Sequence, residues 1–204
     1  MIFRPLEDTV AALDVDVISR SRRKVLRPLV DFICSKLDHQ QEIRLVFVCT
    51  HNSRRSHLAQ VWAQTMAHYF GVGSVVAYSG GTQATAMSPS VAKTLIATGY
   101  RVTPISSGAN RVYAIKFAEN EHPVMGFSKI YDHDFNPRFG FAAVMTCSQA
   151  DRDCPYIEGA EKRISLPYED PKLFDGTKEE EDKYLERSQQ IAAEMHYVFS
   201  EIGR

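Results

Sequence analysis

The chain has 204 residues, of which 44% are hydrophobic and 24% charged, and its formal net charge is −1. This composition is typical of a globular domain with a full core and excludes a disordered or fibrous chain. The near-zero charge argues against a nucleic-acid-binding protein, and no apolar run reaches the ~20 residues of a membrane helix. The start of the chain shows no secretory signal, so we expect a cytoplasmic protein in which the four cysteines are not structural disulfides.

Residues 1–41 have helical periodicity and no strand pattern. Between Leu26 and Leu37, apolar residues recur at steps of three and four, which places them on one face of a helix. Cys34 lies on this face, and we expect it to be a packing residue. We therefore predict a helical N-terminal extension over residues 1–41, followed by the main domain over residues 42–204.

From residue 43 onward, predicted strands alternate with predicted helices, which favours an α/β sandwich around a parallel sheet. A different alternation over residues 110–132 predicts an inserted β-hairpin. Thr177 and Glu180 have the spacing of a capping box at the start of the last helix. The predicted strands are residues 43–48, 75–79 and 141–146, and the predicted helices are residues 56–70, 88–99 and 177 onward.

Cys49 comes directly after the first predicted strand and is followed by a short polar loop and a helix. In open α/β sheets, ligands bind at the carboxyl ends of the strands, and loop N–H groups at a helix N-terminus bind oxyanions. Arg55 can grip two oxygens of such an anion, and Asn52 tolerates left-handed backbone. Loop amides and Arg55 would stabilise a Cys49 thiolate, to which Ser56 can donate a hydrogen bond.

The segment from Val48 to Ser56 resembles the phosphate loop of low-molecular-weight protein tyrosine phosphatases and of the thioredoxin-coupled arsenate reductases with the same fold. The resemblance extends roughly over residues 43–200 and implies a three-layer sandwich with a mostly parallel four-stranded sheet. It also implies that residues 42–204 form the catalytic domain, with Cys49 as the nucleophile and Arg55 as the oxyanion clamp. His51 and Arg54 depart from the family pattern, which usually has glycine and often cysteine at these positions. The predicted oxyanion-binding residues are Thr50, His51, Asn52, Ser53, Arg54 and Ser56.

Two further parts of the site follow from the resemblance. Asp170-Pro171 matches the pair that carries the general acid, although an Asp-Pro pair by itself is a common turn. Cys147 and Cys154 resemble the redox pair of the arsenate reductases. Two inert thiols are the other interpretation of this pair. The spacing of the two cysteines is poor for zinc, so we expect no metal, and we expect no bound cofactor.

The resulting hypothesis is reduction of arsenate. Cys49 attacks the oxyanion, Asp170 protonates the departing water, and Cys147 and Cys154 resolve the intermediate as a disulfide that thioredoxin reduces. A disulfide needs Cα atoms about 4.4–6.8 Å apart, whereas seven residues of helix separate them by roughly 10 Å. Residues 148–153 must therefore loop back on oxidation, and any helix there must at least partly unwind.

Two other interpretations stay open. A phosphatase acting on phosphotyrosine or small phosphate esters would use Cys49, Arg55 and Asp170 but not Cys147 and Cys154. A non-catalytic oxyanion-binding module would use only the loop. In all three, the partner is an oxyanion, and neither nucleic acid nor membrane is expected.

Overall fold

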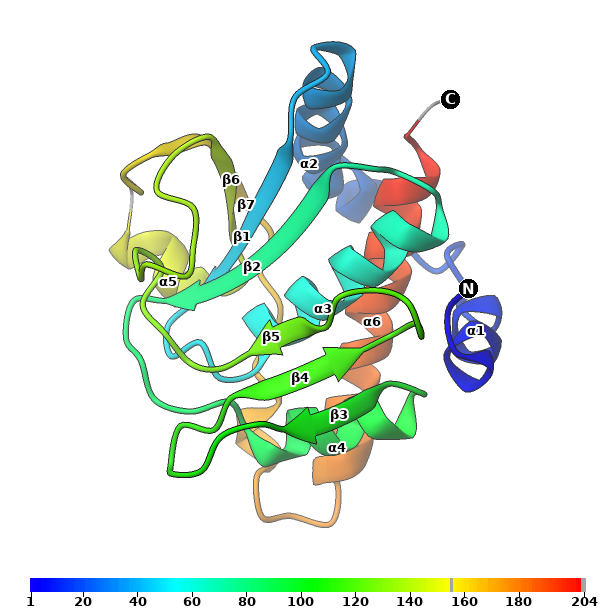
Figure 1. The fold of residues 1–204 in the computed structure, drawn as a ribbon, viewed down its shortest axis with the longest axis vertical. Coiled ribbons are helices and arrows are strands. Elements are labelled where there is room, and N and C mark those ends of the chain that lie inside the picture. Colours follow the sequence, from blue (N-terminus) through cyan, green and yellow to red (C-terminus); the bar gives the residue numbers. More distant parts are fainter. Residues whose placement is uncertain (155, 203–204) are drawn as a thin grey trace.

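The computed structural model describes residues 1–154 and 156–202, which form two sheets packed with helices (Figure 1). The main sheet has four parallel strands in the order β2-β1-β6-β7. This arrangement confirms the predicted α/β class and makes the sheet entirely parallel. Its strands are β1 (Ile43–Cys49), β2 (Val75–Gly81), β6 (Phe141–Met145) and β7 (Ala160–Ser165).

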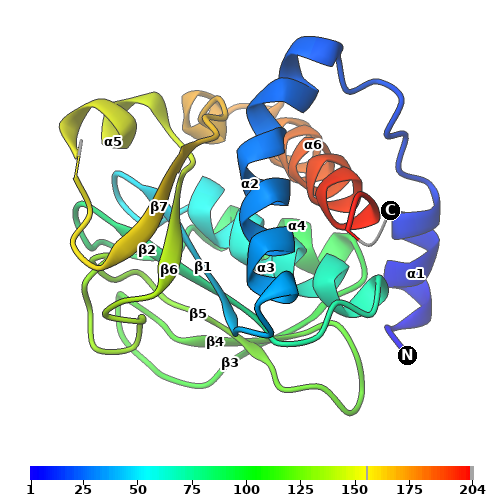
Figure 2. The same cartoon turned by 90° about the horizontal axis from the view of Figure 1, so that it is seen from above.

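Both faces of the main sheet are covered, which explains the almost continuous apolar run of β1. Leu45 and Phe47 point to the larger core, while Val46 and Val48 point to a smaller cluster on the opposite face. In Figure 2 the long helices lie on one side and α5 lies on the other. The helices of the larger core include α2 (Arg20–Asp38), α3 (Arg55–Tyr69), α4 (Pro89–Ala97) and α6 (Glu180–Ser200), and the smaller cluster is covered by α5 (Ser148–Asp153) and loops.

The N-terminal segment is helical, as predicted, with α1 (Arg4–Ala11) preceding α2. Its side chains belong to the larger core, and Ile2 forms an isolated bridge with Ala118. Gly99, with φ of 104°, contacts the backbone of α1 directly. A Cβ at this position would lie 2.4 Å from the Leu6 nitrogen, so a side chain does not fit there. The boundary near residue 42 between an extension and a catalytic domain stays a prediction.

The predicted hairpin is confirmed, and it belongs to a separate antiparallel sheet of three strands. The sequence analysis missed the third strand because its residues are mostly exposed and show no apolar alternation. The edge strand β7 was missed for the same reason. The small sheet has the order β3 (Arg101–Pro104), β4 (Tyr113–Lys116) and β5 (Val124–Gly126).

The predicted capping box at the last helix is wrong. Helix α6 begins at Glu180, and Thr177 Oγ1 accepts a hydrogen bond from Glu179 N, not from Glu180 N. The Glu180 carboxylate accepts hydrogen bonds from Gly176 N and from Ser90 Oγ on α4. The Thr177 N–H, which a capping box would donate to this carboxylate, donates instead to the Phe174 carbonyl at 3.0 Å. Among the described residues, none of the helices is long and apolar enough to cross a membrane.

Candidate active site

The loop after β1 lies at the carboxyl edge of the main sheet, where open parallel sheets place their ligands. Cys49 is the last residue of β1, and α3 begins at Arg55. Between them, Asn52 adopts the left-handed conformation with φ of 44°, as its residue type suggested. We call residues 49–56 the anion loop.

The backbone of the anion loop is oriented so that its carbonyl groups point outward. Those of Cys49, Thr50 and Ser53 accept hydrogen bonds from the backbone of the segment that follows β2, with N···O distances of 2.8–3.1 Å. The carbonyl of His51 accepts from the Ser128 and Thr85 hydroxyl groups. Within the described part of the chain, the N–H groups of residues 50–55 have no backbone acceptor. Such a ring of inward N–H groups at a helix N-terminus binds oxyanions.

The Cys49 thiol is held at the base of this loop. It is 3% exposed, and its Sγ lies 3.2 Å from Ser56 Oγ. Ser56 Oγ accepts a hydrogen bond of 2.9 Å from Asn52 Nδ2, and Asn52 Oδ1 accepts one of 2.9 Å from Lys129 N. This chain of contacts leaves the Ser56 hydroxyl hydrogen directed to the sulfur, so it can stabilise a thiolate.

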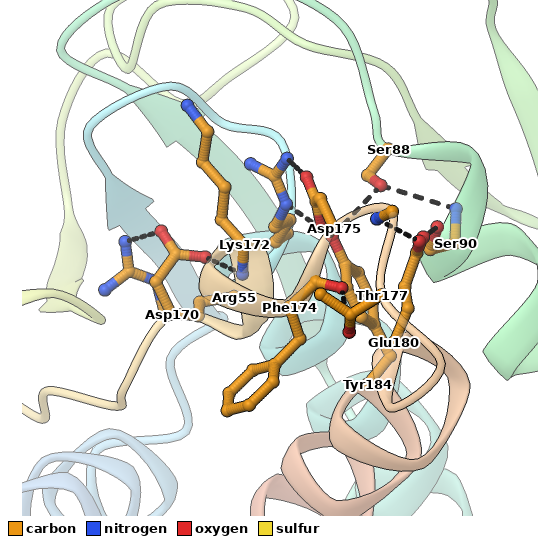
Figure 3. A network of polar contacts seen from close by, with 12 residues as sticks. Arg55, Ser88, Ser90, Asp170, Lys172, Phe174, Asp175, Thr177, Glu180 and Tyr184 are labelled. Carbon is orange, nitrogen blue, oxygen red and sulfur yellow. Dashed lines mark hydrogen bonds and ion pairs between the residues drawn. The ribbon is translucent and has the colours of Figure 1, made fainter.

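The side chain of Arg55 connects the anion loop to the loop that carries Asp170 (Figure 3). Its Nη2 donates to Asp170 Oδ2 at 2.6 Å, and its Nη1 donates to the Tyr168 carbonyl at 3.0 Å. Its Nε is buried and has no hydrogen-bond acceptor. The proposed clamp and the proposed acid are therefore in direct contact, and one guanidinium N–H is available for an anion.

The Arg54 side chain leaves the loop in another direction. It donates from Nη2 to Asp175 Oδ2 at 2.7 Å and from Nε to Tyr184 Oη at 2.6 Å. Any binding of an anion by Arg54 therefore falls to its backbone N–H group. Sequence reasoning missed Asp175 and Tyr184. The departure from the family pattern at Arg54 was the signal that could have led to them.

Cys147 lies beside the anion loop because β6 is the parallel neighbour of β1. It is 1% exposed, and its Sγ is 3.4 Å from Thr50 Oγ1. It also occupies the N-cap of α5, where its Sγ accepts a hydrogen bond from Ala150 N at 3.3 Å. Two of the predicted cysteines, Cys49 and Cys147, are thus brought to the same sheet edge.

Cys154 is not brought to this position, because it is the C-cap at the other end of α5. About two turns of helix separate Cys147 from Cys154, which places the two ends of α5 about 10 Å apart. Arg163 on β7 fastens this end of the helix: its Nε donates to the Cys154 carbonyl at 3.0 Å, and its Nη2 contacts the carbonyl and the carboxylate of Asp151. Ser165 Oγ donates to the same carboxylate at 2.7 Å. None of the described cysteines forms a disulfide.

Two buried bases lie behind the anion loop. Lys129 is 1% exposed, its Nζ faces the rings of Phe127 and Phe135, and burial lowers its pKa to about 7. Burial, together with the charge of Lys129, lowers the pKa of His57 to about 3. His57 is therefore neutral at physiological pH. Within the described residues, no group of three or more His, Cys, Asp or Glu side chains is arranged to hold a metal ion.

Comparison with known proteins agrees with this geometry. Residues 44–119 match the low molecular weight phosphotyrosine protein phosphatase family. An arsenate reductase of Bacillus licheniformis is 25% identical over 159 residues, which cover 78% of this chain and 96% of that protein. Together these similarities support a low-molecular-weight protein tyrosine phosphatase-like family that includes an arsenate reductase branch.

Solved structures of this family share the fold. A low-molecular-weight protein tyrosine phosphatase from T. tengcongensis superposes with a TM-score of 0.53 and 16% identity, covering 79% of this chain and 100% of that one. A mutant of YwlE from Bacillus subtilis gives a TM-score of 0.51 and 15% identity, with coverage of 78% and 97%. Since the family consists of phosphatases and arsenate reductases, the chain is an enzyme rather than a non-catalytic module.

Proposed function

We propose that this enzyme reduces arsenate to arsenite through Cys49 and a disulfide relay over Cys147 and Cys154. The observation that carries the proposal is the position of Cys147, whose sulfur lies 3.4 Å from the hydroxyl of Thr50, the residue after the nucleophile. A hydrolytic phosphatase needs no second thiol at this place. The similarity to a curated arsenate reductase over most of the chain supports the same activity.

Arsenate would enter the anion loop and be bound by its N–H groups and by Arg55. The buried Nε of Arg55 is available, and Nη2 would exchange Asp170 for an arsenate oxygen. This exchange releases the Asp170 carboxyl group toward the leaving oxygen. Binding of the anion and freeing of the acid are then the same event.

The chemistry proceeds in balanced steps. The Cys49 thiolate attacks arsenic, Asp170 donates a proton to the departing oxygen, and water leaves. The Cys147 thiolate then attacks Cys49 Sγ. The S–S bond forms while the S–As bond breaks, and its electron pair stays on arsenic, which leaves as arsenite.

Cys154 completes the relay. Its thiolate attacks Cys147 Sγ, which releases the Cys49 thiolate and leaves a Cys147–Cys154 disulfide. We propose that a thioredoxin supplies the two electrons that reduce it, which suits the reducing cytoplasm. For this step α5 must open, because its ends lie about 10 Å apart and a disulfide needs Cα atoms within 4.4–6.8 Å. An oxidised structure in which residues 147–154 superpose on the present ones would count heavily against the relay.

The alternative is a phosphatase in which water resolves the cysteinyl intermediate. It is favoured by the closed state of α5, in which Cys147 Sγ serves as a helix cap. The residues after Asp170 do not favour a phosphotyrosine substrate. Leu173 is 83% exposed, and the ring of Phe174 packs toward Lys183 on α6, so no aromatic side chain from this segment flanks Asp170 (Figure 3).

The test compares both activities in wild type and Cys147→Ser. We expect arsenate-dependent NADPH consumption with thioredoxin and its reductase, falling by ~100-fold or more in Cys147→Ser. Aryl-phosphate hydrolysis, if present, should change little in the variant. Cys34→Ser is the matched control, since Cys34 is half-buried on α2 away from the loop. Wild type that hydrolyses aryl phosphate without consuming NADPH would establish the phosphatase instead.

A further inference from the structure

The short helix that carries Asp170 is held at both ends by consecutive arginines of the anion loop. This helix, η1 (Pro171–Phe174), has Asp170 as its N-cap and Asp175 as its C-cap. Arg55 binds Asp170, and Arg54 binds Asp175, each through one oxygen at 2.6–2.7 Å. Figure 3 shows Arg55 beside Asp170 at one end of η1 and Asp175 towards the other end.

The contact at Asp175 is a closed set of three hydrogen bonds. Arg54 donates to both Asp175 and Tyr184, and Tyr184 Oη donates to the second oxygen of Asp175 at 2.7 Å. Tyr184 is fully buried, and the Arg54 side chain is 14% exposed. Burial acts to lower the pKa of Arg54, but the hydrogen bond and charge of Tyr184 and the carboxylate of Asp175 raise it overall. Arg54 is therefore a fixed charge in a place where water screens it poorly.

The two ends of η1 are mechanically linked. Lys172 N donates to Asp170 Oδ1 at 3.1 Å, and Asp175 N donates to the Lys172 carbonyl at 3.0 Å. Any shift of Asp175 is thus transmitted to Asp170 through a single turn. This link matters most when an oxyanion binds Arg55. Asp170 then loses its ion pair with Arg55, and only the hydrogen bonds of η1 keep it in place.

We propose that Arg54 is a positioning residue for the general acid: through Asp175 it fixes η1 and thereby holds Asp170 over the anion loop after Arg55 has turned to the substrate. This inference rests on the proposed role of Asp170, which both the reductase and the phosphatase mechanisms use. The positioning role explains why the anion loop contains Arg54, whose charged side chain points away from the anion-binding N–H groups.

The test is a double-mutant cycle on arsenate turnover with Arg54→Gln, Asp170→Asn and the combined variant. General acid catalysis contributes about 100-fold to 10,000-fold, so we expect Arg54→Gln to lower kcat by roughly 10-fold or more with little change in KM. In the Asp170→Asn background the same substitution should have almost no further effect. The alkaline limb of the kcat profile should flatten in Arg54→Gln as it does in Asp170→Asn. Arg54→Lys should restore part of the loss.

Asp175→Asn weakens the same set of bonds from the other side and keeps Arg54, so it serves if Arg54→Gln fails to fold. Arg27→Gln is the control, because it removes an exposed arginine–aspartate pair on α2. Losses that multiply in the double variant, or an unchanged pH profile, would overturn the proposal. So would full activity of Asp170→Asn.

Absence of arsenate turnover in wild type would count against the proposed reductase, not against Arg54. The same cycle would then be measured on phenyl and p-nitrophenyl phosphate. The loss in Arg54→Gln should be larger for phenyl phosphate, whose leaving group needs the proton more. Equal losses for the two esters would reject the positioning role.

Discussion

The anion loop and the α5 segment are both parts of the proposed site, but they are fastened in different ways. Carbonyls of the anion loop are tied to the segment after β2 and to Ser128, and Asn52 links its interior to Lys129. Helix α5 has only six residues and covers the smaller apolar cluster on the other face of the main sheet. Its C-terminal end is held by hydrogen bonds from Arg163. A loop that binds charge in a tetrahedral geometry must be preorganised, whereas a helix whose ends must meet must be able to open.

The largest expected effect comes from breaking the anion loop with Asn52→Ala. The substitution removes two buried hydrogen bonds and puts alanine at a φ of 44°. We expect a loss of about 2–4 kcal/mol in the free energy of unfolding, measured by chemical denaturation. Arsenate turnover and any aryl-phosphate hydrolysis should fall together. Asn120→Ala, in an exposed turn, is the control. A loss confined to one activity would mean that the loop is not shared.

For Arg163→Gln we expect a smaller loss of stability, together with a faster disulfide step instead of a loss of activity. Removing the fastening of α5 should cost only about 1 kcal/mol in stability, but it should raise the rate of Cys147–Cys154 disulfide formation several-fold. Quenched alkylation after one arsenate turnover measures this rate, and hydrogen exchange over residues 148–154 measures the opening. Arg152→Gln, an exposed arginine on the same helix, is the control. A slower disulfide step in Arg163→Gln would show that the closed helix assists the relay.

The smallest effect concerns Lys129, whose backbone holds the anion loop while its buried amine has a pKa of about 7. In the unfolded chain this amine stays protonated up to its ordinary pKa of 10.5, whereas in the folded chain it loses its proton near pH 7. Because the unfolded state binds the extra proton, the free energy of unfolding of the wild type rises between about pH 7 and 10.5. Lys129→Met removes the cost of burying the charge. We expect it to be more stable than wild type by about 1 kcal/mol at pH 6 and to lose this advantage by pH 10.

Thermal unfolding at both pH values measures the difference, with the exposed Lys178→Met as control. Turnover should be retained, because the Lys129 N–H that binds Asn52 is unchanged. An advantage that grows with pH would mean that Lys129 is charged and well compensated in the folded protein.

The sequence by itself determined the features whose signals are local. The strand, the loop and the helix around Cys49 lie within a few consecutive residues, so their hydrophobic pattern and residue types suffice to place Cys49 before Arg55 at a helix start. The spacing of Cys147 and Cys154 likewise implied that any helix between them must open. The antiparallel hairpin was readable because its strands alternate, whereas β3 and β7 lie at sheet edges with polar residues and carry no period.

Only the tertiary structure decided which charged groups face the site. Arg54 and Asp175 are 121 residues apart in the chain, and Arg55 and Asp170 are 115 apart. Arginine and aspartate side chains are mostly exposed in proteins, so their presence in the sequence does not reveal which of them form ion pairs in the site. The same holds for Glu180, whose predicted local cap yields to a contact with Ser90. Long-range electrostatic partners are selected by packing, and packing is settled only when the sheet and its helices are assembled.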